Sequence, residues 1–203
     1  MIVQEEFRQQ ICSFMDYVWN ETQQSSKGCV DMRLVVPNHC FIRLLGASTV
    51  KDVGCDQKCH QFLNELQSLH GTARPNIVLR MTRGPTESCI HFHCDNPGST
   101  CTLQMALNDP SEHIGGRLCF YVDNKMHILE RPIASVVKHG NNFLHGVTNL
   151  VSGTRKSLFV LDESARLEKE GAIMISLSQL NRFIRTTAAA SENVNQTQCV
   201  DAA

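Results

Sequence analysis

The second half of the chain constrains the fold most strongly, because residues 77–162 form a series of short apolar segments divided by turn sequences. The turn sequences, such as 96–98 and 140–142, are rich in Gly, Pro, Asn and Asp, which tight turns favour. Strands are predicted at residues 77–82, 89–93, 100–107, 118–122, 127–130, 135–139 and 155–162. Seven or eight short strands indicate a two-sheet barrel or jelly roll.

Two amphipathic helices are predicted ahead of these strands. Apolar side chains recur at steps of three and four in residues 3–20, and residues 56–70 repeat that spacing before Gly71. A short strand is expected at 32–36, closed by Pro37. Such apolar stripes favour packing beneath a sheet over a membrane or partner helix. The predicted class is therefore α+β, mainly β.

Length and charge limit the kinds of protein this can be. The chain has 203 residues, 19 Lys and Arg against 20 Asp and Glu, and a formal net charge of -1. One domain with a full core is expected, and charge implies no nucleic-acid partner. The ten cysteines come without a secretory leader and without an apolar run of membrane-spanning length. Reduced thiols, a cytoplasmic location with a nuclear one left open, and no membrane association are expected.

The chemistry centres on His93 and Asp95, which form an H-x-D pair near the end of a predicted strand. Side chains two apart on a strand point to the same face, so an imidazole and a carboxylate would lie together. A further histidine, His145, is followed ten residues later by Arg155. Two histidines and one carboxylate on one side of a metal are typical of non-haem Fe(II) oxygenases.

Four short motifs occur in one order along residues 75–162. After H-x-D come L-N-D at 107–109, G-G-x-L at 115–118 and H-x-V-x-x-L-x-x-G-x-R-x-S at 145–157. Together they resemble the 2-oxoglutarate/Fe(II) dioxygenases of the prolyl-4-hydroxylase-like type. The resemblance implies a double-stranded β-helix (jelly-roll) core, iron at one open end, and N-terminal helices packed on the major sheet.

Four histidines compete for the two imidazole positions. Only His93 has an aspartate two residues later, because His91 has His93 at that offset. His145 has an arginine ten residues on, whereas His139 does not. The resemblance therefore implies His93, Asp95 and His145 as the catalytic metal ligands.

Arg155 is the expected anchor of the cosubstrate. Its guanidinium can hold the distal carboxylate of 2-oxoglutarate with two hydrogen bonds, and Ser157, on the same strand face, could donate a third. Lys156 should point the other way. The alternative is a structural role for Arg155, in which Asp162 or residue 163 neutralises a buried charge.

By resemblance, the cofactors are Fe(II), 2-oxoglutarate as cosubstrate and O2, with ascorbate as an accessory reductant. The reaction would hydroxylate an unactivated C–H bond and release succinate and CO2. A prolyl or other peptidyl residue is the expected substrate, and a free amino acid or other small molecule is the alternative. A third reading is an inactive binding module on the same fold. The oligomeric state is not fixed by the sequence.

Two departures from the family bear on cosubstrate binding. Relatives often carry tyrosines where this chain has Met81 and Ala106, and neither residue can donate a hydrogen bond. Thr102 or Gln104 could supply the missing donor. Asp95 favours oxygen insertion over halogenation, because halogenating relatives replace this carboxylate by a small residue.

The sequence gives less support to two other functions, nucleobase repair and zinc binding. Repair dioxygenases that act on nucleobases carry a second arginine at the place of Leu161. A zinc site at Cys55, Cys59 and His60 lacks a second ligand pair, and Cys59 falls on the apolar helix face.

One dioxygenase domain is expected over residues 1–185. It comprises a helical lead-in at 1–74, a β-core at 75–162 and an extension at 163–185. A tail without a fixed structure is expected at 186–203, because that segment lacks core-forming residues.

Overall fold

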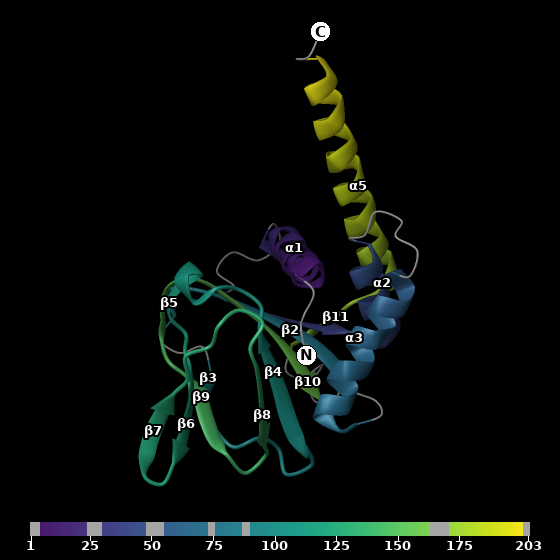
Figure 1. Cartoon of the computed structure of the whole chain (residues 1–203). Helices are drawn as coiled ribbons and strands as arrows, with labels where there is room; N and C mark the ends of the chain where they lie inside the picture. The colour runs from purple at the N-terminus through teal and green to yellow at the C-terminus, as the bar shows by residue number, and fades with distance from the viewer. Residues whose placement is uncertain are drawn as a thin grey trace.

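The computed structural model describes residues 5–23, 30–47, 55–72, 76–86, 90–162 and 171–200. Two β-sheets form one part of the molecule, and helices cover the larger sheet on one side (Figure 1). The helices are α1 (Glu5–Gln23), α2 (Asn38–Gly46), α3 (Cys55–His70) and α5 (Leu177–Val200), with a short 3-10 helix η1 (Pro110–Glu112). The predicted α+β class is confirmed.

The larger sheet has seven strands in the order β11-β1-β2-β10-β4-β8, and β5 pairs with one end of β10. Its strands are β1 (Asp31–Val36), β2 (Asn76–Arg83), β4 (Cys101–Ala106), β5 (His113–Gly115), β8 (Val136–Gly140), β10 (Leu150–Leu161) and β11 (Ile173–Met174). The long strand β10 is central, with antiparallel β2 on one side and antiparallel β4 on the other.

The smaller sheet has the order β3-β9-β6-β7. Its strands are β3 (Ile90–His93), β6 (Leu118–Val122), β7 (Lys125–Ile128) and β9 (Leu144–Val147). Side chains of the two sheets meet, since Phe120 of β6 lies 5.2 Å from the His139 ring of β8.

All seven strands predicted from the second half are present, with ends shifted by up to five residues. Two further strands, β5 and β9, were not predicted, and β11 lies in a segment for which the sequence left open a strand followed by a helix. The sequence of β9, Leu-His-Gly-Val, has neither strict alternation nor a row of β-branched residues. It becomes a strand because it pairs with β3 on one side and β6 on the other.

The two faces of the larger sheet have different roles, and β10 shows this most clearly. Leu158 and Val160 point to the helices and join the main hydrophobic core. Arg155 and Ser157, at the alternate positions, must face the smaller sheet. The helix side of the sheet thus provides stability, and the opposite side provides the site.

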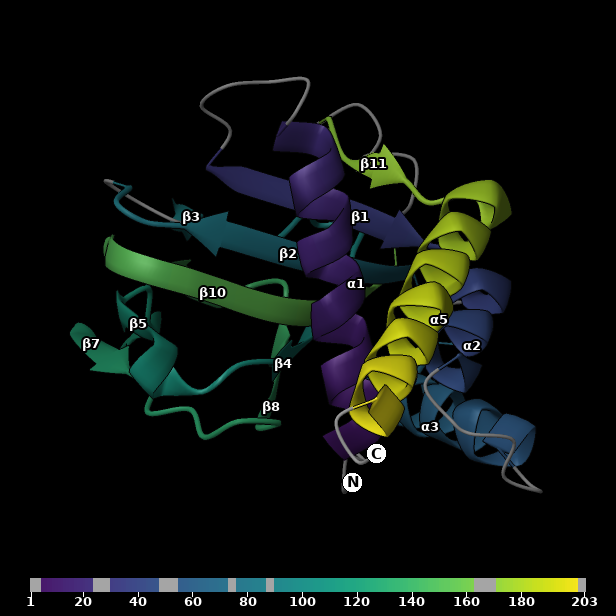
Figure 2. The same cartoon turned by 90° about the horizontal axis from the view of Figure 1, so that it is seen from above.

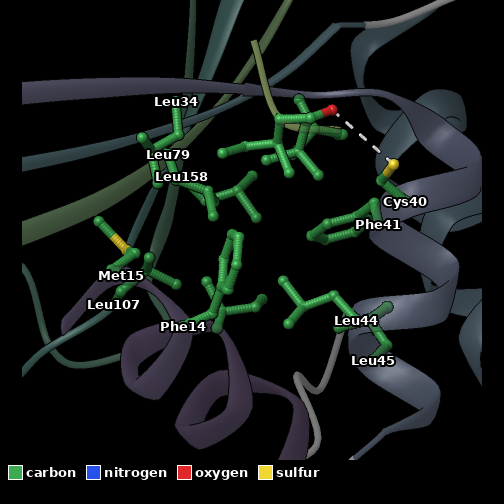
Figure 3. Close-up of a cluster of buried hydrophobic side chains, with 14 of the residues drawn as sticks. Phe14, Met15, Leu34, Cys40, Phe41, Leu44, Leu45, Leu79, Leu107 and Leu158 are labelled. Atoms are coloured by element: carbon green, nitrogen blue, oxygen red, sulfur yellow. Dashed lines mark hydrogen bonds between the residues drawn. The ribbon is translucent and has the colours of Figure 1, made fainter. Parts of the chain in front are cut away.

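The helices bury the apolar stripe that the sequence predicts. Seen from above, α1 crosses β1, β2 and β10, and α5 lies beside α2 (Figure 2). In the core, Phe14 of α1 and Phe41 of α2 point toward Leu79 and Leu158 of the sheet (Figure 3). The Cys40 thiol donates a hydrogen bond to the carbonyl of Ile175 at 3.9 Å.

Three features of the helical part differ from the sequence prediction. Pro37 was expected only to close a strand, but helix α2 begins directly after it. Proline is well tolerated at the start of a helix. In α3, Leu69 is 42% exposed while His70 is buried in its place. Helix α5 continues to Val200, into the range 186–203 that was expected to lack structure. Its alanines 188–190 favour helix strongly without needing core contacts.

None of the described helices is long and apolar enough to cross a membrane. The six cysteines whose side chains are described are free thiols.

Candidate metal centre

The predicted H-x-D pair lies where β3 ends. His93 is the last residue of that strand, and Asp95 follows two residues beyond it. The Nε2 atom of His93 lies 3.5 Å from Oδ1 of Asp95. Local chain geometry thus places an imidazole and a carboxylate together, as the spacing predicts.

His145 joins this pair from β9. The two strands are antiparallel, and His93 is directly opposite His145 in their register. The ring centroids are 4.5 Å apart, and Nε2 of His145 lies 3.8 Å from Oδ1 of Asp95. One ligand atom from each of the three residues lies within 4.8 Å of the other two. The structure therefore brings together all three predicted ligands.

The remaining histidines lie outside this group. His91 is exposed, and its carbonyl accepts a hydrogen bond from the His93 ring at 2.7 Å. His139 is buried beside the cluster, with its ring centroid 4.2 Å from that of His145. Its Nδ1 bonds the Gly140 carbonyl at 3.2 Å and lies 3.7 Å from Oδ2 of Asp95. His139 thus packs against the ligands from a separate strand.

The hydrogen bonds of His93 and His145 fix ring tautomers that suit a metal. Nδ1 of His93 bonds the His91 carbonyl, and Nδ1 of His145 bonds the Phe143 carbonyl at 3.0 Å. A carbonyl oxygen can only accept, so Nδ1 carries the proton in each ring. Burial lowers the pKa of His145, which favours its neutral form. Each Nε2 can then offer a lone pair to a cation. The donor set fits a divalent transition metal such as iron.

Asp95 is held by a residue that the sequence did not single out as a partner. The Thr102 hydroxyl of β4 donates a hydrogen bond to Oδ2 of Asp95 at 2.7 Å. This leaves Oδ1, the atom that faces both imidazoles, for a metal. Thr102 is therefore committed to orienting the carboxylate and is not a spare donor for a cosubstrate.

Thr102→Val should weaken metal binding without removing a ligand. Valine keeps the shape of threonine but cannot hold Asp95, and loss of such a supporting bond typically costs about 10–100-fold in metal affinity. Calorimetric titration with Mn(II) measures this, and Thr102→Ser, which keeps the hydroxyl, is the matched control. Equal affinity in Thr102→Val and wild type would contradict the role.

Arg155 and Ser157 lie further along the same interior. Arg155 is 6% exposed and Ser157 1% exposed, and both line a pocket that is partly open to solvent. Ser157 is opposite Ala106 in the register of β10 and β4. On the inner face of β4, Thr102 is therefore at the metal end and Ala106 at the pocket end, with Gln104 between them.

Two of the sequence motifs position Arg155. The side chain of Asn108 donates to the carbonyl of Thr154 at 2.7 Å and accepts from the amide of Lys156 at 2.8 Å, so it fixes the backbone on both sides of Arg155. Gly116 has a φ of +65°, and an added Cβ would lie 3.2 Å from Cδ of Arg155. A glycine there lets the arginine stem pass close to the backbone.

The neighbours of Arg155 in sequence have other partners. Lys156 points to the helix side, as predicted, where Nζ bonds Asp16 of α1 at 2.6 Å. Asp162, considered as an internal partner for Arg155, accepts two hydrogen bonds from Thr100 and lies 3.2 Å from His70. Residue 163 lies outside the described residues.

Two residues, Met81 and Ala106, were expected to leave the cosubstrate without a hydrogen-bond donor, and the strand register corrects this expectation for Met81. Met81 belongs to the core cluster on the helix side of β2, so it does not line the pocket. Thr82, which is opposite Arg155, faces the interior instead. Ala106 does line the pocket. The loss of a hydrogen-bond donor is therefore confined to Ala106.

Two further polar side chains lie in the interior. The sequence suggested only a possible donor role for Gln104 and no role for Arg131. Gln104 is 1% exposed, and its Nε2 is buried without a hydrogen-bond partner. Arg131 lines the same pocket as Arg155. Arg131 follows β7 in a loop, where no periodicity marks an inward residue, so no sequence signal identified it.

The fold of this chain resembles that of solved structures. A prolyl-4-hydroxylase from Pseudomonas putida matches with a TM-score of 0.53 and 13% identity, over 78% of this chain and 86% of the other. The chain shares its fold. AviO1 from Streptomyces viridochromogenes Tue57 gives a TM-score of 0.52 and 12% identity, over 79% and 85% of the two chains. At such identities the likeness concerns the fold alone.

A 2OG-Fe(II) oxygenase family structure from Burkholderia pseudomallei matches less well, with a TM-score of 0.41 and 14% identity. The matched region is 56% of this chain and 60% of the Burkholderia chain. No family model and no curated protein matches the sequence.

Proposed function

We propose that the protein is a 2-oxoglutarate- and Fe(II)-dependent dioxygenase that hydroxylates a prolyl or other peptidyl residue. The observation that carries this is the approach of His93, Asp95 and His145 to within 4.8 Å, at the end of an interior that also contains Arg155. The two facing sheets support a double-stranded β-helix core, and the fold of a prolyl-4-hydroxylase is consistent with it.

The residues of this chain would divide the work between two ends of the interior. His93, Asp95 and His145 would hold Fe(II) from one side and leave its other positions open. When bound, iron and the 2-oxo acid supply the oxidising chemistry that inserts one atom of O2 into a C–H bond, with succinate and CO2 as the other products. Arg155 and Ser157 would bind the distal carboxylate and so fix the direction of the cosubstrate.

The exposure of the centre favours a peptide over a free amino acid. The His93 side chain is 43% exposed, so a large molecule can approach the metal side. Phe143, which is 41% exposed, lies 6.4 Å from Phe120, whose ring packs against His145. An exposed aromatic ring beside the centre suits the apolar ring of a prolyl residue. A free amino acid or other small molecule is the alternative substrate.

The test is succinate release from 2-oxoglutarate by the purified chain with Fe(II) and ascorbate. We expect slow release without substrate and faster release with proline-containing peptides than with free amino acids. Dependence on added Fe(II) and loss of release with Zn(II) in its place serve as controls. Binding of 2-oxoglutarate without any succinate release would instead identify an inactive binding module.

A further inference from the structure

A second buried arginine, Arg131, lines the pocket that contains Arg155. Arg131 follows β7, and its Nη2 atom donates to the carbonyls of Gln104 at 2.9 Å and Ser135 at 2.8 Å. These two carbonyls belong to the β4–β8 region beside Ala106, the small residue that lines the pocket opposite Ser157. The Arg131 guanidinium is therefore fixed next to the space that Ala106 leaves open.

The hydrogen bonds of Arg131 do not use all of its donors. Its Nε is buried with no hydrogen-bond partner, and within the described residues no carboxylate lies within ion-pair distance of it. A buried N–H without an acceptor is destabilising, because it has lost its hydrogen bond to water without replacing it. The nearest acidic residue in sequence, Glu130, is bonded to Arg117 at the exposed rim.

The charges of Arg131 and Arg155 also interact. Burial lowers the pKa of Arg131 to about 10, and the charge of Arg155 contributes in the same direction. Arg131 remains a cation at neutral pH, so two positive groups share one pocket end. Two cations at one end of a pocket favour the binding of an anion there.

We infer that Arg131 is a second anchor for the distal carboxylate of the 2-oxo acid cosubstrate, acting with Arg155 and taking the place of a donor that Ala106 cannot provide. This inference rests on the proposed function. It predicts that a diacid with a carboxylate at the far end is strongly preferred over a 2-oxo acid that lacks one.

The test compares two probes on the full chain loaded with Mn(II), with binding followed by calorimetry. The first probe is 2-oxoglutarate, and the second is pyruvate, which keeps the 2-oxo acid group but has no distal carboxylate. Arg131→Leu should raise the dissociation constant of 2-oxoglutarate about ten- to a hundredfold, the effect of losing a charged hydrogen bond. The constant for pyruvate should stay within about twofold.

Two further variants make the result specific. Arg117→Leu removes a cation from the rim of the same pocket, where it is exposed and paired with Glu130, and should change 2-oxoglutarate binding less than about threefold. Arg131→Lys keeps the charge and can still reach a carbonyl, so it provides a folded variant if Arg131→Leu does not fold. It should weaken 2-oxoglutarate binding by an intermediate amount.

The inference fails if 2-oxoglutarate binds the Arg131 variants as tightly as wild type. It also fails if both probes weaken equally, since that would indicate that Arg131 only stabilises the β4–β8 end. If wild type binds neither probe with metal present, the proposed function itself fails, which is a different result.

Discussion

Replacing His93 or Asp95 by alanine is expected to abolish Fe(II)-dependent succinate release while the fold remains intact. Each residue supplies one of three ligand atoms within 4.8 Å, so its loss leaves two. Neither residue belongs to a hydrophobic core cluster, and the His93 side chain is 43% exposed. Turnover should therefore fall more than about a hundredfold, beyond the effect typical of a supporting residue. Thermal unfolding of the metal-free protein should change little.

His91→Ala is the matched control for this experiment. His91 is two residues from His93 on the same strand and is exposed, but it contributes a backbone carbonyl to the centre and not its ring. Its replacement should keep metal binding and succinate release. If His91→Ala lost the metal and His93→Ala kept it, the assignment of ligands would be wrong.

The sequence predicted the grouping of His93, Asp95 and His145 because the geometry of this group is largely local. An aspartate two residues after a histidine is held near it by two peptide units, whatever the rest of the fold does. His145 and Arg155 are similarly linked, since β9 and β10 are consecutive strands and Arg155 is positioned by the Asn108 side chain of the L-N-D motif. Short motifs in a fixed order therefore carry most of the site.

Contacts between distant segments could not be read in the same way. Thr102 reaches Asp95 only because the two sheets face each other, and Arg131 enters the pocket from a loop. The case of Met81 shows how sensitive such predictions are to register. Neighbouring residues of β2 point to opposite faces of the sheet. Met81 therefore packs in the core on the helix side, and Thr82 faces the interior with Arg155.

In the N-terminal region too, the sequence predicted what depends on local periodicity and missed what depends on packing between distant segments. The apolar stripe of α1 was predicted correctly because helix periodicity is visible in a single segment. Helix α2 was missed because its nine residues are too few to show a clear period and begin just after a proline. Its position depends on packing between α1, α3 and the sheet, as Phe41 in the core illustrates (Figure 3).

Arg155→Leu is expected to have the largest effect on cosubstrate binding with the metal site preserved. Arg155 is 6% exposed, and its backbone is fixed by Asn108 and its stem passes Gly116. Its guanidinium can hold a carboxylate with two parallel hydrogen bonds, which a leucine cannot replace. The dissociation constant of 2-oxoglutarate should rise by about a hundredfold or more, while Fe(II) affinity stays near that of wild type.

Arg155→Lys separates the charge of the anchor from its shape. Lysine keeps the positive sign but loses the planar fork, so 2-oxoglutarate should bind about ten- to a hundredfold more weakly than to wild type and more tightly than to Arg155→Leu. The charge-transfer absorption of the Fe(II) protein, titrated with 2-oxoglutarate without oxygen, measures both variants. Lys156→Leu is the matched control, because Lys156 lies one residue away on the opposite strand face and bonds Asp16 of α1. It should leave the titration unchanged and lower stability by about 1 kcal/mol at most. Unchanged affinity in Arg155→Leu would remove Arg155 as the anchor, and with it the main sequence argument for His145 over His139.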